Sequence, residues 1–457
     1  MLACNGYEVV DLGVMVPADR ILKAVEETKA DVLGLSGLIT PSLDEMVFVA
    51  REMERRRMHV PLLIGGATTS RQHTAVKIAP EFRGPTVHVL DASRVGDVMS
   101  SLMNPAQRAQ FEEYNRGLQE QLRVQHAARK ERPLLPYDAA LKNRLAIDWP
   151  SESLPTPAFL GRRSIEVPLE ELVPYIDWTF FFTAWDLKGR FPAILDHPEY
   201  GGAARELYDN ARTLLDRIVR ERLLTARGVY GFWPAASEGD DLVLFVDEQR
   251  TGEQLRFNML RQQEMMPDGK PNLSLADFVA DRDAHVRDYV GAFAVTAGLG
   301  AEELARRFEA ENDDYSAIMV KALADRLAEA FAAYLHARTR AEWGIQEAVS
   351  NEDILHEKHR GIRPGFGYPA CPDHSEKFKL FELLHAGEIG MALTEHAAMT
   401  PAASVSGLYF AHPLARYFMV GRVGEDQVAA YARRKGSSIA DTERWLTSSL
   451  SYEPANC

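Results

Sequence analysis

Apolar and polar positions follow a regular pattern through the first hundred residues, where short apolar runs alternate with segments of helical spacing. Four apolar runs have the length and composition of β-strands: Tyr7–Leu12, Val32–Ile39, Val60–Ile64 and Thr86–Leu90. A segment with helical spacing follows each run, and in the first of these, Ala18–Ala30, the apolar stripe is Ile21, Leu22 and Val25. Strands that alternate with helices in this way predict a parallel sheet with helices on both faces.

The start of the chain changes how this sheet is interpreted. Residues 1–6 have the pattern of a helix end that is followed by a glycine. In a flavodoxin-like (Rossmann-like) sheet of order 2-1-3-4-5, the first strand lies in the middle. If Tyr7–Leu12 is the second strand, the first strand lies upstream of this sequence. We therefore expect residues 1–112 to form a flavodoxin-like α/β domain that lacks its first strand.

The pattern changes after this domain. Residues 113–154 combine a highly charged helical pattern with a proline-rich stretch, and we expect a linker there. Residues 155–457 should form a larger α+β domain, because their strand-like and helical segments do not alternate. The strand-like runs are Gly228–Phe232, Leu242–Val246, Val290–Thr296 and Ser404–Phe410. The helical patterns are Tyr208–Glu221, Tyr315–Arg340 and Glu425–Gly436.

Composition narrows the class of protein. The chain has 457 residues, 52 Lys and Arg against 66 Asp and Glu, and a net charge of −14, which disfavours a nucleic-acid binder. Its longest weakly charged stretch, Ala397–Ala415, is interrupted by two prolines, so no membrane helix is predicted. Cys4, Cys371 and Cys457 are odd in number and far apart, which argues against a disulfide framework. We expect a cytoplasmic protein.

The segments after the later strands have an unusual composition for a nucleotide site. They contain small hydroxyl residues and glycine rather than Lys or Arg, at residues 35–40, 64–70 and 90–93. Ligands of open α/β sheets bind at these strand ends, and phosphate-binding loops normally carry a Lys. A bulky, largely neutral ligand fits this composition better than a nucleotide. The alternative, that the Ser and Thr residues only cap helices, stays open.

The densest candidate in the second domain is the segment Arg363–His374, which is rich in proline and glycine. Such a loop exposes backbone groups that can bind a flat heterocycle, and Arg363 could bind a carboxylate in bidentate fashion. A plain surface loop with a solvated Arg363 is the alternative. Cys371 and His374 have the spacing of a metal-ligand pair, but no second pair accompanies them, so no metal site is predicted.

Seven motifs, taken together, resemble the family of cobalamin-dependent methionine synthases. They are DLGVMVPADRIL, LSGLITPSLDEM, LIGGATTSRQHTAVKI, YIDWTFFF, DDYSAIMVKALADRLAEAFAAYLH, GIRPGFGYPACPDHSEK and ASVSGLYFAHPLARYF. The resemblance covers essentially the whole chain. It implies a cobalamin-binding domain, truncated at its N-terminus, followed by an S-adenosylmethionine-binding activation domain.

The resemblance also implies roles for individual residues. The positions that match contacts to the nucleotide tail of cobalamin are Ser36, Thr40, Gly65, Gly66 and Ala92. The positions that match the S-adenosylmethionine site are Asp177, Glu329, Glu357, Arg363, Gly365, Tyr368, Tyr417 and Phe418. These residue types suit the ligand, because its amino and sulfonium groups are cationic and its carboxylate pairs with Arg. No catalytic side chain is expected, since methyl transfer from a sulfonium to cobalt removes no proton.

The function implied by the resemblance is reductive remethylation of cob(II)alamin to methylcobalamin, with flavodoxin or a similar flavoprotein as electron donor. The family's DxHxxG motif, whose His binds cobalt, would lie upstream of residue 1. The zinc-containing homocysteine module and the folate module would lie there too. Two alternatives remain: a stand-alone corrinoid-binding partner that reactivates a separate methyltransferase, and an ordinary S-adenosylmethionine methyltransferase. A GxGxG-type loop would be typical of the latter, and none opens the second domain.

Overall fold

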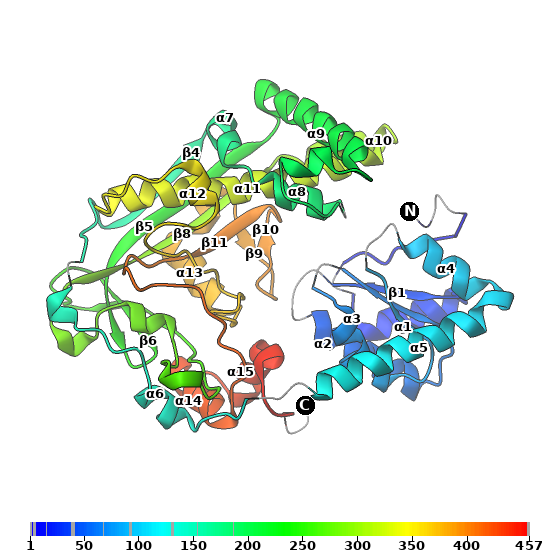
Figure 1. Cartoon of the computed structure of the whole chain (residues 1–457), viewed down its shortest axis with the longest axis horizontal. Coiled ribbons are helices and arrows are strands. Elements are labelled where there is room, and N and C mark those ends of the chain that lie inside the picture. Colours follow the sequence, from blue (N-terminus) through cyan, green and yellow to red (C-terminus); the bar gives the residue numbers. More distant parts are fainter. Residues whose placement is uncertain are drawn as a thin grey trace. The chain divides into compact units, whose positions relative to one another are not determined.

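The chain folds into two compact units, Met1–Arg132 and Pro133–Cys457, and each is described by itself (Figure 1). The structure, a computed structural model, describes all residues except 1, 3–5, 15, 38–41, 67, 91–93, 129–131, 153, 186 and 455–457. Within the described residues, no helix combines the length and the apolar character that crossing a membrane requires.

The first unit contains a parallel three-stranded sheet in the order β1-β2-β3. The strands are β1 (Leu33–Ser36), β2 (Leu62–Gly65) and β3 (Thr86–His88). The helices are α1 (Ala18–Thr28), α2 (Ser42–Arg55), α3 (Arg71–His73), α4 (Val95–Met103) and α5 (Pro105–Ala128). This arrangement confirms the predicted α/β fold, and the strand order agrees with strands 3-4-5 of the expected sheet.

Both faces of this small sheet are buried. Leu62 and Ile64 of β2 pack in one core with α1 and α2, whereas Leu63 packs in a second core with Met99 and Leu102 of α4. Successive side chains of a strand point to opposite faces, so a strand between two helical layers must be apolar throughout. This is the reason that the continuous apolar runs in the sequence predicted these strands correctly.

The prediction of a strand at Tyr7–Leu12 is wrong. The segment has no regular structure, and the side chains of Val9 and Val10 are 51% and 53% exposed. A strand exists only through ladder hydrogen bonds to a neighbour. The β1 strand pairs with β2, and no segment in the described part of the chain pairs with the other edge of β1. An apolar run without a partner strand therefore does not produce a strand here.

The second unit is built on a six-stranded sheet in the order β11-β8-β5-β6-β7, with β4 paired to β5. All of these pairs are antiparallel. The strands are β4 (Gly161–Val167), β5 (Thr225–Glu238), β6 (Asp241–Phe245), β7 (Glu253–Asn258), β8 (Asp288–Leu299) and β11 (Ser404–Tyr409). A separate short pair is formed by β9 (Ala392–Leu393) and β10 (Met399–Thr400).

Helices cover both faces of this sheet, which confirms the predicted α+β class (Figure 1). They are α6 (Tyr137–Lys142), α7 (Leu169–Leu172), α8 (Trp178–Ala184), α9 (Gly201–Glu221), α10 (Ala301–Ala310), α11 (Asp314–Glu342), α12 (Asn351–Leu355), α13 (Glu376–Leu384), α14 (Glu425–Lys435) and α15 (Ile439–Leu446). Phe293 and Val295 of β8 face the core shared with α11, whereas Ala292 and Ala294 face the core shared with α13.

The boundary between the units falls inside the segment that we expected to be a linker. Its first part belongs to α5, whose Asn115 and Gln119 side chains donate to the carbonyl of Thr86 in the first unit. Its second part packs on the second unit, where the backbone N–H of Leu135 donates to the carbonyl of Gln263. Residues on either side of the 132/133 boundary are thus anchored to different units.

A buried ion cluster joins several segments of the second unit. The guanidinium of Arg261 is fully buried, and its Nε donates to Asp240 at 2.9 Å. Its Nη1 and Nη2 donate to the two carboxylate oxygens of Asp277 at 2.8 and 2.7 Å. The backbone N–H of Arg261 donates to the side chain of Gln427 on α14 at 2.8 Å. The cluster therefore fixes the β5–β6 turn, the segment after β7 and α14 to one another.

Replacing Arg261 by Met should lower the free energy of unfolding by about 3–5 kcal/mol, because two buried carboxylates lose their counter-charge. Urea denaturation of the full chain measures this effect. The control is Arg205→Ala, which breaks a largely exposed pair with Asp196 and should cost less than about 1 kcal/mol. Equal losses in the two variants would show that the buried cluster does not stabilise the unit.

Candidate functional site

The site in the second unit is built on the loop Arg363–Tyr368, which lies along the outer edge of β11. Ile362 and Phe410 exchange both backbone hydrogen bonds, at 3.1 and 3.0 Å. The N–H of Leu408 donates to the carbonyl of Pro364 at 3.0 Å. The loop therefore occupies the place of a further strand, and it gains a fixed backbone without regular secondary structure.

Glycine is required where the loop and β11 approach each other. A Cβ atom at Gly407 would lie 2.4 Å from the carbonyl oxygen of Pro364, and one at Gly365 would lie 2.9 Å from the carbonyl oxygen of Ser406. Neither space accepts a side chain without moving the backbone. Gly365, predicted as a binding residue, thus also has a packing role that the sequence did not reveal.

Arg363 contacts two of the other predicted residues, and a third, Glu357, lies beside one of these. Its Nη1 lies 3.8 Å from the Glu329 carboxylate on α11, and its backbone N–H donates to the hydroxyl oxygen of Tyr417 at 3.1 Å. Burial and the nearby carboxylate of Glu357 raise the pKa of Tyr417 to about 12, so the phenol stays protonated. The structure therefore brings Arg363, Glu329, Tyr417 and Glu357 together from four separate segments.

Tyr368 lies at the exposed rim of this group, with 62% of its surface accessible. Partial burial of its hydroxyl and the negative charge of Glu329 both raise the pKa of Tyr368. An exposed aromatic ring beside a carboxylate and a guanidinium offers a flat surface to a ligand. Tyr368 thus belongs to the same site as Arg363.

Asp177 occupies a position at the start of α8. Its carboxylate accepts the N–H of Thr179 at 2.8 Å and so caps the helix. The α8 helix packs against α11, where the guanidinium of Arg326 lies 5.9 Å from the Phe180 ring centre. Asp177 thus starts a helix that contacts the helix of Glu329, and its expected cationic partner stays a prediction.

Phe418 has a different environment from its neighbour Tyr417. Its ring packs edge-on against Phe278, with 6.3 Å between the ring centres, and it lies against two apolar cores of the unit. Core packing, the default interpretation from the sequence, accounts for this side chain. A role for Phe418 in ligand binding stays a prediction.

Sequence reasoning missed a histidine that lies close to Arg363. His336 on α11 is 3% exposed, and its ring stacks on Tyr409 and meets His359 edge-on, with centres 5.2 and 4.8 Å apart. Burial and the positive charge of Arg363 hold the pKa of His336 well below its ordinary value, so the ring is neutral. His336 follows Glu329 by two helical turns, a spacing that could have indicated a shared face.

In the first unit, the predicted residues meet at the carboxyl edge of the sheet. Ser36 ends β1 and pairs in register with Gly65 of β2. Gly66 has a φ of +102°, and a Cβ atom there would lie 2.3 Å from the carbonyl oxygen of Gly37. This edge therefore presents backbone and small side chains. Thr40 and Ala92, the other two predicted residues, lie outside the described residues.

The hydroxyl groups at this edge already have structural roles. Thr68 and Thr69 donate to the carbonyls of Gly37 and Gly66 at 3.0 and 2.9 Å, and the Ser70 hydroxyl accepts the N–H of His73 and caps α3. The capping interpretation is confirmed for Ser70, whereas Thr68 and Thr69 bind backbone carbonyls of the loops themselves. In the described part of the chain, no three His, Cys, Asp or Glu side chains are grouped so that they could hold a metal ion.

Comparison with known proteins identifies both units. The family model for the vitamin B12 dependent methionine synthase, activation domain, matches residues 168–436, and the model for the B12 binding domain matches residues 1–90. A crystal structure of the MetH reactivation domain bound to AdoHcy is 47% identical in sequence, with a TM-score of 0.69. The match covers 70% of this chain and all of that chain. These findings confirm the resemblance seen in the sequence.

Replacing His336 by Phe should make stability less dependent on pH. The unfolded chain takes up a proton on His336 as the pH falls below about 6.5, whereas the folded chain does not, so wild type loses stability in acid. The variant keeps the ring and should lose about 1.4 kcal/mol less per pH unit below pH 6, measured by urea denaturation from pH 7 to pH 5. The exposed His396, replaced by Phe, is the control. Identical slopes for wild type and His336→Phe would contradict the prediction.

Proposed function

The chain belongs to the family of the vitamin B12 dependent methionine synthase activation domain, and we propose that it carries out the reductive remethylation of cobalamin. Its cofactors are cobalamin, bound by the first unit, and S-adenosylmethionine, bound by the second unit. The methyl donor would be the sulfonium of S-adenosylmethionine, and S-adenosylhomocysteine would be the product that leaves. A flavoprotein such as flavodoxin would supply the electron that this reaction requires.

The observation that carries this proposal is the meeting of opposite charges at the loop Arg363–Tyr368. The guanidinium of Arg363 suits the ligand carboxylate, and the carboxylate of Glu329 at 3.8 Å suits its amino and sulfonium groups. Glu357 and the cap residue Asp177 add negative charge on neighbouring segments. The exposed ring of Tyr368 suits the adenine. A zwitterion that also carries a sulfonium and a flat base matches this set of groups.

The first unit fits cobalamin at the carboxyl edge of its sheet. The edge formed by Ser36, Gly65 and Gly66 has no bulky side chains. The backbone of Gly66 lies so close to that of Gly37 that a side chain would not fit there. Ligands of open parallel sheets bind at this edge. When bound, cobalamin supplies the metal centre that takes the methyl group. The residues of this chain bind and orient the two ligands, and none needs to remove a proton.

The proposed reaction places the chain in a larger methyl-transfer system. A methyl group that leaves cobalt needs an acceptor, and the family resemblance assigns that role to homocysteine, with methyltetrahydrofolate as the primary donor. We propose that homocysteine and folate modules and a flavoprotein electron donor are its partners. The net charge of −14 is compatible with protein partners and offers no general basic surface for nucleic acid.

Arg363→Ala should weaken the binding of S-adenosylmethionine by about 1.5–3 kcal/mol, the scale of a charge-assisted hydrogen bond. Calorimetric titration of the full chain measures the affinity. The matched control is Arg338→Ala on α11, whose guanidinium pairs with Glu342 and which should bind as wild type does. Equal affinity of wild type and Arg363→Ala would remove Arg363 from the site.

Asp177→Asn should reduce the preference for S-adenosylmethionine over S-adenosylhomocysteine by roughly five-fold, since only the former carries the sulfonium charge and one such interaction is worth about 1 kcal/mol in a solvated site. The amide can still accept the N–H of Thr179, so the cap is kept. Asp313→Asn is the matched control, because Asp313 caps α11 in the same way. An unchanged ratio of the two affinities would show that Asp177 does not sense the sulfonium.

A further inference from the structure

We propose that Cys371 and His374 are positioning residues that hold the loop Arg363–Tyr368 in its binding conformation. This inference rests on the proposed function, because it concerns the S-adenosylmethionine site. Neither residue belongs to the group that faces the proposed ligand. Both belong to the segment Cys371–Lys377, called the support segment below, which follows the loop directly.

The support segment begins with a tight backbone turn that brings it under the loop. The N–H of Gly367 donates to the carbonyl of Cys371 at 2.8 Å, and the N–H of Cys371 donates to the carbonyl of Tyr368 at 2.9 Å. The Cys371 thiol is buried and donates to the carbonyl of Gly365 at 2.9 Å. This bond reaches Gly365, which lies against β11, so it fixes the middle of the loop.

The second contact is made by the ring of His374 under Gly367. Gly367 has a φ of +90°, and a Cβ atom there would lie only 2.2 Å from the His374 ring. Burial and the charge of Lys377 lower the pKa of His374 to about 4, so the ring is neutral and its Nδ1 can accept. The ammonium of Lys377 lies 3.0 Å from that Nδ1 and also donates to the carbonyl of Ala397 at 3.2 Å. The ring is thereby held in place.

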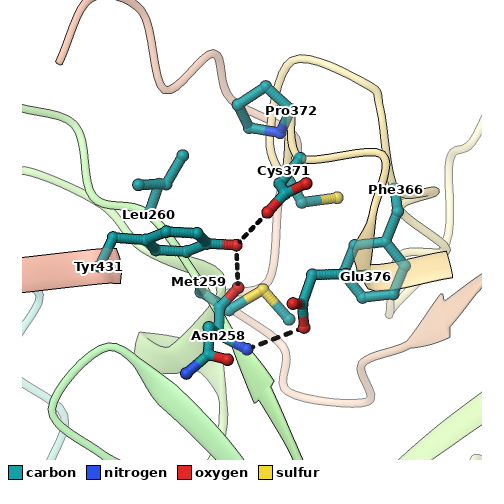
Figure 2. Close-up of a pocket in the computed structure, with 9 residues that line it drawn as sticks. Asn258, Met259, Leu260, Phe366, Cys371, Pro372, Glu376 and Tyr431 are labelled. Carbon is teal, nitrogen blue, oxygen red and sulfur yellow. Dashed lines mark hydrogen bonds between the residues drawn. The ribbon is translucent and has the colours of Figure 1, made fainter. Parts of the chain in front are cut away.

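The support segment is itself anchored to the rest of the unit through a small pocket (Figure 2). The hydroxyl of Tyr431 on α14 donates to Asp373 at 2.7 Å and lies 3.3 Å from the carbonyl oxygen of Asn258. The backbone N–H of Asn258 donates to Glu376 at 3.1 Å, and Lys435 pairs with Asp373 and Glu376. Figure 2 shows Cys371, Glu376 and Tyr431 around this pocket. The anchor is therefore made entirely by residues of this unit.

These contacts fix the backbone of the loop at its two glycines. Gly365 and Gly367 have no side chains with which to fix their own backbone, and glycine has the largest conformational freedom in the unfolded chain. A loop that must be ordered on binding loses affinity, whereas one that is already held does not. The thiol of Cys371 and the ring of His374 therefore act on the ligand through the loop, and their effect should extend to every ligand that the loop binds.

The test measures affinities of the full chain for S-adenosylmethionine and S-adenosylhomocysteine by calorimetry, together with melting temperatures. Cys371→Ala should weaken both ligands about three-fold to ten-fold, the scale of one neutral hydrogen bond. Cys371→Ser keeps a donor and should recover most of the affinity. The control is Ser237→Ala, which removes a buried donor to the carbonyl of Val279 and should lower the melting temperature without changing affinity.

His374→Ala provides a second variant in case Cys371→Ala does not fold, and it should likewise weaken both ligands. If Cys371→Ala and His374→Ala both bind the two ligands with the affinity of wild type, this inference is overturned and the proposed function is left intact. Equal losses in Cys371→Ala and Cys371→Ser would also overturn it, because the donor would then be irrelevant. Failure of wild type to bind either ligand would instead overturn the proposed function.

Discussion

The ion cluster around the buried guanidinium of Arg261 holds several segments of the second unit in place. A charge without access to water is tolerated only when its donors are satisfied, and Asp240, Asp277 and the carbonyl of Asn272 do so. The same residue binds Gln427 and so fixes α14 in position. Because Tyr431 of α14 holds Asp373, the geometry beneath the ligand loop follows from an ion cluster that lies on another part of the unit.

The central sheet determines where a ligand site can be placed. Its strands β5 and β8 carry apolar side chains on both faces, and these side chains pack in two separate cores with the helices. The outer edge of β11 carries backbone groups that can bind a neighbouring segment, and the loop Arg363–Tyr368 is hydrogen-bonded to that edge. The site is therefore made of one backbone edge and of charged side chains that α11 and the neighbouring loops bring to it.

Much of the fold followed from periodicity, because buried strands and amphipathic helices repeat at fixed spacings. The helices that include Tyr208–Glu221 and Tyr315–Arg340 were predicted for that reason. The strand expected at Tyr7–Leu12 failed because pairing depends on a neighbour and not on the segment itself. The site residues came from the family resemblance, yet the sequence could not reveal that Arg363 lies beside Glu329 or that Asp177 caps a helix. His336 was missed because burial beside a charge is a property of the folded chain.

The protonation state of the Cys371 thiol matters for its reactivity toward a methyl donor. A sulfonium methyl group is an electrophile, and a thiolate is one of the best nucleophiles that a protein contains. Burial raises the pKa of Cys371, so this sulfur remains a protonated and weakly nucleophilic thiol. A cysteine can therefore be kept directly under a loop that presents a methyl donor, and the methyl group is not lost to the protein by self-alkylation.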